Sequence, residues 1–138
     1  MNDKIDKRTK QLTNIFGKIK FLDNGELSHL YESVRLHNDC LFIVAELTSE
    51  AYKIREHAYL ERKHVYAETV KGASGTVAEK EAEAELAIHE LRKEEADAGS
   101  LYDRYNRMFK ALDHRLIDLR QNRNVLEKEM TYINDKQG

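Results

Sequence analysis

The sequence predicts an all-α protein built on one long antiparallel helical hairpin. None of the 138 residues is proline, the residue that most strongly interrupts helices. The clearest turn, Gly72-Ala73-Ser74-Gly75, separates two long stretches with helical spacing. After the turn, apolar or aromatic residues recur every seven positions: Val77, Ala84, Leu91, Ala98, Tyr105, Leu112, Leu119, Leu126 and Ile133. This strict repeat predicts a helix that supercoils with a partner helix.

Two helices are expected before the turn. The first covers residues 3–22, where apolar residues keep mostly helical spacing, and it ends at Asp23-Asn24-Gly25. The second runs from Glu26 to about Lys71 without any residue that would break it. Together they account for the chain up to the main turn.

A third helix is expected from Val77 to about Ile133. Thr76 and Glu79 have the spacing of a capping box, in which each side chain accepts a hydrogen bond from the backbone of the other. Gly99-Ser100 is the one pair within the helix that could loosen it or act as a hinge.

The apolar rows predict two parts within one domain. The apolar face becomes narrower near residue 48 on one long helix and near residue 99 on the other. These two positions lie side by side in an antiparallel hairpin that turns at residues 72–75. Residues 1–47 plus 100–135 are expected to form a three-helix bundle, completed by the N-terminal helix, at the base of the hairpin. Residues 48–99 are expected to form a coiled-coil-like arm with its turn at 72–75. Because two helices alone bury little apolar surface, the arm is expected to pack on other subunits of a homo-oligomer or on a partner.

The sequence favours a binding protein over an enzyme, because no Ser/His/Asp or Cys/His set stands out and a thin arm on a small bundle offers few concave pockets. The net charge is −2, and no apolar stretch is long enough to cross a membrane. Cys40 lies in an apolar run and is expected to be a small buried residue. We expect a cytoplasmic protein (in the host cytoplasm if it is phage-encoded) without membrane contact, catalytic residues, cofactor or small-molecule substrate.

Metal binding is not expected either. Glu26-x-x-His29 and Glu61-x-x-His64 match the spacing found in di-iron bundles, where the pairs come from facing helices. Here both pairs lie far apart on one helix, so they cannot share a site. The glycine turn is also too short for a phosphate-binding loop and lacks its lysine.

One helix face combines arginine with tyrosine. The candidate nucleic-acid-binding residues are Tyr52, Arg55, Tyr59, Arg62 and Tyr66 on that face, with Lys63 and Lys71 nearby. Tyrosine rings can stack on bases and arginines can pair with phosphates of single-stranded DNA. Two alternatives remain open. The tyrosines could cover the alanine-rich seam while the arginines pair with Glu81, Glu85 or Glu95, or the face could bind a protein.

The acidic run from Glu79 to Glu85 is expected to be a solvated first turn, where carboxylates complement the helix dipole. Its functional alternative is a partner-binding or DNA-mimicking stripe over residues 79–97 that occupies a basic site on a host protein, as a phage anti-defence inhibitor would. A structural or scaffolding oligomer is a further alternative for the whole chain.

A set of short segments extends from Tyr59 through Glu129, over about half of the chain. The segments are Tyr59-Leu60-Glu61-Arg62-Lys63, Gly72 and Gly75 through Ala84, Leu91-Arg92-Lys93, Ala111-Leu112, Leu119-Arg120 and Leu126. They resemble small helical proteins encoded near recombination and single-strand-binding genes in bacteriophages, and the layout is similar to that of the recombination mediator of T-even phages. The resemblance implies a helical oligomer that helps a recombinase load onto single-stranded DNA coated by its single-strand-binding protein.

Overall fold

The computed structural model describes residues 2–137, and these residues form helices and no strands. The helices are α1 (Asp3–Ile19), α2 (Leu27–Gly72), α3 (Val77–Ala87) and α4 (His89–Gln137). The predicted all-α hairpin is confirmed, because α2 packs against both α3 and α4. No helix within the described residues has an apolar stretch that could cross a membrane.

Two compact units make up the chain. The three-helix unit contains the residues up to Leu47 and those from Asn106 onward, and the hairpin unit contains Thr48–Tyr105. Helices α2 and α4 each contribute residues to both units.

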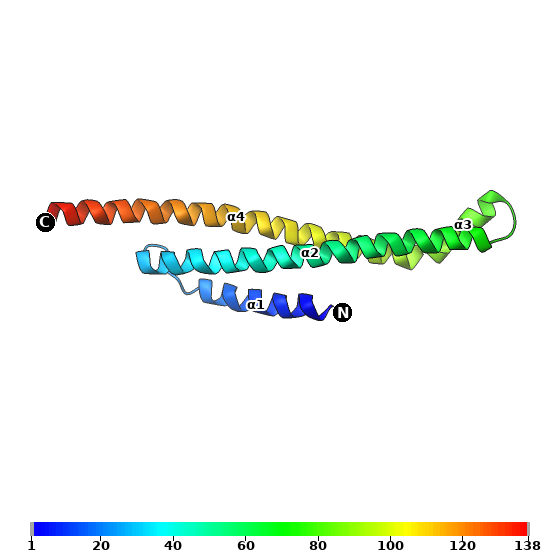
Figure 1. The fold of residues 1–138 in the computed structure, drawn as a ribbon, viewed down its shortest axis with the longest axis horizontal. Helices are drawn as coiled ribbons and strands as arrows, with labels where there is room; N and C mark the ends of the chain where they lie inside the picture. The colour runs from blue at the N-terminus through cyan, green and yellow to red at the C-terminus, as the bar shows by residue number, and fades with distance from the viewer. Residues whose placement is uncertain (1, 138) are drawn as a thin grey trace. The chain divides into compact units, whose positions relative to one another are not determined.

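Large aliphatic side chains form the core of the three-helix unit. In Figure 1, α1 and α4 lie on either side of α2 in this unit. Leu30 and Val34 of α2 pack with Leu116 and Leu119 of α4, and all four side chains are buried. Helix α1 adds the buried Leu12. An ion pair between Arg8 and Glu46, 2.6 Å apart, also joins α1 to α2.

The buried thiol of Cys40 belongs to the same unit, as expected for a free cysteine in an apolar run. Removing the thiol from water disfavours its charged form. Burial, with a smaller contribution from Asp39, therefore raises the pKa of Cys40 to about 11. Cys40 is a poor nucleophile in this environment.

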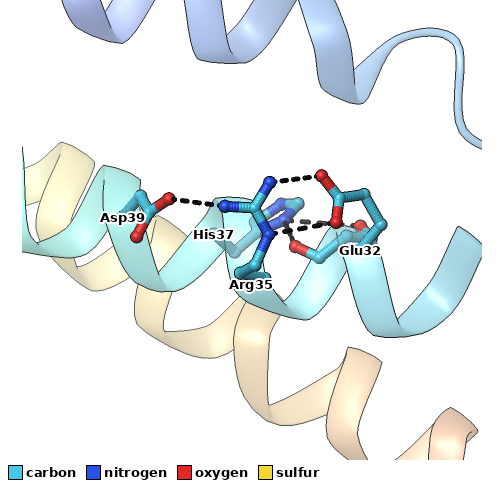
Figure 2. A network of polar contacts seen from close by, with 5 residues as sticks. Glu32, Arg35, His37 and Asp39 are labelled. Carbon is cyan, nitrogen blue, oxygen red and sulfur yellow. Dashed lines mark hydrogen bonds and ion pairs between the residues drawn. The ribbon is translucent and has the colours of Figure 1, made fainter.

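Polar side chains cover the outer surface of α2 in the three-helix unit. Figure 2 shows Arg35 between Glu32 and Asp39 on successive turns. The hydrogen bond from Arg35 lowers the pKa of Glu32. His37 is buried, and its Nδ1 lies 2.7 Å from the carbonyl oxygen of Ser33, so the ring has a partner within its own helix. The ion pairs of Arg35 therefore belong to the helix surface, and the hydrogen-bonded His37 belongs to the core.

Helix α2 runs beside α3 and the start of α4 in the hairpin unit (Figure 1). The turn between them contains Gly75, whose φ of 108° is a conformation that favours glycine. The predicted capping box is present: the Glu79 N–H donates to Thr76 Oγ1, and the Thr76 N–H donates to Glu79 Oε2, each at 3.2 Å. The start of α3 is therefore fixed by local hydrogen bonds.

The third helix is interrupted where the sequence predicted it to be continuous. Ile88 separates α3 from α4, with φ −98° and ψ 4°, whereas Gly99 and Ser100 lie inside α4. Hydrogen bonds still cross the break, from the Ile88 N–H to Ala84 and from the Arg92 N–H to Ile88. Ala84 and Ile88 are both fully buried. Because residues four apart lie on the same face of a helix, both side chains share one buried face across the break.

Candidate nucleic-acid interface

Two adjoining grooves follow one side of the seam between α2 and α4 in the hairpin unit. The first, of about 610 Å³, is lined by Arg55, Glu56, Tyr59, Arg62, Arg92, Glu95 and Ala96. The second, of about 540 Å³, is lined by Arg62, Lys63, Tyr66, Ala67, Glu85 and Arg92. Because both grooves include Arg62 and Arg92, we treat them as one continuous feature, the arginine–tyrosine groove.

Two tyrosine rings hold Arg55 at one end of this groove. Its guanidinium carbon lies 5.4 Å from the ring centre of Tyr52 and 4.6 Å from that of Tyr102. The two rings are 5.6 Å apart and inclined by 56°. Contact with a ring face orients a guanidinium while leaving N–H groups at its edge for other acceptors. The nearest carboxylate, Glu56, is 3.6 Å from Arg55.

Tyr59 stands beside two cations in the middle of the groove. The guanidinium carbon of Arg62 lies 5.4 Å from its ring centre, and the ammonium nitrogen of Lys63 lies 5.0 Å from it. Arg62 also forms an ion pair with Glu95 of α4, with a second contact of 3.5 Å. The hydrogen bond to Glu95 raises the pKa of Arg62. The alternative in which the arginines pair with glutamates of the facing helix predicted an ion pair of this kind. Arg62 forms it and also lines the groove.

Arg92 and Tyr102 of α4 are part of this feature although the sequence did not suggest them. Arg92 lines both parts of the groove and pairs with Glu85 at 2.9 Å. Tyr102 contributes a ring to the Arg55 contact. The observed pairing of Arg62 with Glu95 places Arg92, one turn before Glu95, beside the same α2 face. The sequence left three glutamates open as partners of Arg62, so it did not single out Arg92.

The other candidate nucleic-acid-binding residues lie at different positions relative to the arginine–tyrosine groove. Tyr66 is half-buried and lines the groove together with the exposed Lys63. Tyr52 is 45% exposed and contacts Arg55 from the outside. Lys71 is exposed in the last turn of α2 and does not line either part of the groove. The structure therefore brings six of the seven candidates together and leaves Lys71 apart.

The two Glu-x-x-His motifs differ in their contacts, because Glu61 pairs with His57, 3.9 Å away, rather than with His64. Glu26 and His29 lie 3.5 Å apart, and within residues 2–137 no three His, Cys, Asp or Glu side chains are grouped so that they could hold a metal ion. In the acidic run, Glu79 caps α3 and Glu85 pairs with Arg92. Comparison of the chain with protein-family models, curated proteins and solved structures gives no match in any of the three.

Proposed function

We propose that this protein is a non-enzymatic accessory factor of DNA recombination or replication, of phage type, that binds single-stranded DNA in the arginine–tyrosine groove. The observation that carries the proposal is the alternation of three guanidinium groups with tyrosine rings along one groove. Single strands are bound without sequence preference by this combination, because aromatic rings stack on any base and cations track the backbone.

The carboxylates in the groove determine how such binding would work. Glu95 and Glu85 already neutralise Arg62 and Arg92, so a DNA phosphate has to replace a carboxylate as the partner of each arginine. Part of the electrostatic gain is lost in this exchange. We therefore propose modest, strongly salt-dependent affinity for DNA, with stacking on Tyr59 and Tyr66 supplying the remainder.

We further propose that the protein acts as a homo-oligomer and that its protein partners are a recombinase or a single-strand-binding protein. The support is the resemblance of residues 59–129 to phage recombination proteins, together with the thin core of the hairpin unit, in which alanines hold three buried positions, Ala51, Ala84 and Ala98. A small core gives little stability to an isolated pair of helices.

Fluorescence anisotropy with a labelled single-stranded oligonucleotide tests DNA binding. Arg55→Ala/Arg62→Ala is expected to weaken binding by about 10-fold or more, since hydrogen bonds between charged partners contribute roughly 1.5–3 kcal/mol each. Arg35→Ala is the matched control, because Arg35 is also an ion-paired arginine of α2 but lies in the other unit. Equal binding by the wild type and the double variant would exclude the groove.

Glu95→Gln sharpens the same experiment. It removes the carboxylate that competes with DNA for Arg62 while keeping the shape of the side chain, so tighter binding is expected. An unrelated surface site would respond to neither Glu95→Gln nor the arginine substitutions. Circular dichroism verifies that each variant remains helical.

A protein-binding inhibitor that acts through the acidic stripe is the second candidate function. It is supported by the exposure of Glu79, Glu81, Glu83 and Glu85 along α3. Two of these four carboxylates already have partners, which reduces the charge available to a basic site. Pull-down from host lysate with Glu81→Gln/Glu83→Gln tests this candidate, and an unchanged set of captured proteins would exclude it.

A further inference from the structure

A second groove follows the other side of the hairpin seam. Its floor is apolar and consists of Ile54 and Ala58 of α2 with Ala98 and Leu101 of α4. On α2 these residues precede Arg55 and Tyr59 by one position, which rotates them by about 100° around the helix axis. We call this feature the alanine groove. It is separate in its lining residues from the arginine–tyrosine groove.

Small side chains keep the centre of the alanine groove shallow. Ala98 is 6% exposed and Ala58 is half-buried. Small residues at such positions allow another helix to approach closely, as in four-helix bundles. Ile54 and Leu101 on the floor are half-buried, so a helix seated here would also remove apolar surface from water.

Charges along the rim of the alanine groove are segregated. Lys53 lies at one end, while Glu61, Glu94 and Asp97 lie toward the other. Lys53 and Glu61 are eight residues apart on α2, which corresponds to about 12 Å along the axis. Because one end is positive and the other negative, the rim is complementary to its own copy turned end to end.

We infer that the alanine groove binds the same groove of a second copy of this chain, with the two hairpins antiparallel about a twofold axis near Ala58. A twofold interface uses one patch twice and therefore requires a self-complementary surface. In this arrangement Lys53 of each copy faces Glu61 and Glu94 of the other, and the four apolar floor residues of each copy meet at the centre. The product is a four-helix contact in which both arginine–tyrosine grooves remain on the outside.

The ion pairs that Lys53 and His57 form within α2 are weak enough to be exchanged for contacts with a second copy. Lys53 lies 3.6 Å from Glu50, and His57 lies 3.9 Å from Glu61, all within α2. Lys53 and His57 are exposed, with side-chain exposures of 69% and 83%. Exposed pairs of this kind contribute little free energy, so either side chain can change partner at small cost.

This inference rests on one part of the proposed function, the homo-oligomer, and names the surface through which the copies would contact each other. It does not depend on DNA binding. Sedimentation equilibrium over a concentration series tests it with the full chain. The wild type is expected to approach twice the chain mass of 16.1 kDa. Lys53→Glu and Glu61→Lys are each expected to weaken dimerisation by about 10-fold, since the twofold axis repeats each lost pair.

The charge-swapped double variant Lys53→Glu/Glu61→Lys is the decisive case. It restores opposite charges between positions 53 and 61 of the two copies, while Glu94 then faces a glutamate. Its dimerisation is therefore expected to exceed that of either single variant and to return part of the way to that of the wild type. Lys93→Glu is the matched control: Lys93 is also exposed and pairs with a glutamate three residues earlier, Glu90, but it lies outside the groove. Dimerisation of Lys93→Glu is expected to equal that of the wild type.

Ala58→Glu tests the centre of the interface by placing a charge between the copies, and it is expected to give a monomer that remains helical by circular dichroism. A monomeric wild type, or a dimer insensitive to both single charge reversals, would overturn the inference. Anisotropy on the same samples separates the two proposals. DNA binding by a monomeric wild type refutes only the alanine-groove dimer, whereas a dimer with the expected charge dependence but without DNA binding refutes only the proposed function.

Discussion

The two units of the molecule bury different kinds of side chain. The three-helix unit buries large aliphatic residues such as Leu30, Leu116 and Leu119 almost completely. In the hairpin unit the fully buried positions include Ala51 and Ala84, with Ile88 as the large exception. Apolar packing thus stabilises the first unit more strongly, and the long polar side chains of both candidate binding surfaces lie beside the thin seam of the second. Stability and binding chemistry are concentrated in different parts of one chain.

Leu119→Ala is expected to have the largest effect on stability. Leu119 is fully buried in the core of the three-helix unit, and truncating such a leucine costs about 2–5 kcal/mol of the free energy of unfolding. Urea denaturation measures the change. Ile117→Ala, at a 44% exposed position of the same helix, serves as the control and is expected to cost well under half as much. Equal losses of unfolding free energy in Leu119→Ala and Ile117→Ala would contradict the expectation that the buried leucine stabilises this unit more than the exposed isoleucine.

Gly99→Ala is expected to have a smaller effect of the opposite sign, in the hairpin unit. Gly99 lies inside α4, and an added Cβ would be 3.9 Å from Cδ of Arg55, which is ordinary van der Waals contact. Alanine stabilises a helix interior relative to glycine by about 0.5–1 kcal/mol. Gly75→Ala is the contrasting control, because its positive φ disfavours a side chain and predicts destabilisation. A loss of stability in Gly99→Ala would indicate that the position acts as a hinge.

The titration of Cys40 has no effect on stability at neutral pH and acts only under alkaline conditions. Burial raises the thiol pKa from 9.0 to about 11 in the folded protein. Between these values the unfolded chain releases the proton while the folded chain retains it, so stability falls as pH rises above 9. Cys40→Ala is expected to lose less stability than the wild type between pH 9 and 11. Parallel denaturation curves at pH 8 and 10 measure this difference, and identical pH dependence in both proteins would contradict it.

Much of the fold was predictable because helical periodicity is a local signal. The apolar residues that recur every seven positions predicted the face that packs on the partner helix. Ala84, Ala98, Leu112 and Leu119 of this set are buried as expected. Its ends differ: Val77 is 72% exposed and Ile133 is 52% exposed, because a periodic pattern does not show where partner helices end. The break at Ile88 was not predictable from glycine or proline, since neither is present there. It is a local change in the backbone angles of Ile88, which the spacing of apolar residues does not encode.

The candidate site was predictable on one helix only. The spacing of Arg55, Tyr59 and Arg62 predicted a common face on α2 from helical geometry alone. Arg92 and Tyr102 belong to α4, and their positions depend on how the two helices align. The partner of Arg62 was also one of several glutamates until the alignment selected Glu95. Whether this face binds DNA remains a prediction.

The salt dependence of DNA binding tests the central claim most directly. If Arg55, Arg62 and Arg92 each neutralise one phosphate of a single strand, the logarithm of the association constant should fall with the logarithm of salt concentration at a slope of about −2, which is three times roughly −0.7. Arg55→Ala/Arg62→Ala should reduce the slope to about −0.7, whereas Arg35→Ala should leave it unchanged. A wild-type slope near zero, or one that the double variant does not alter, would contradict DNA binding in the arginine–tyrosine groove.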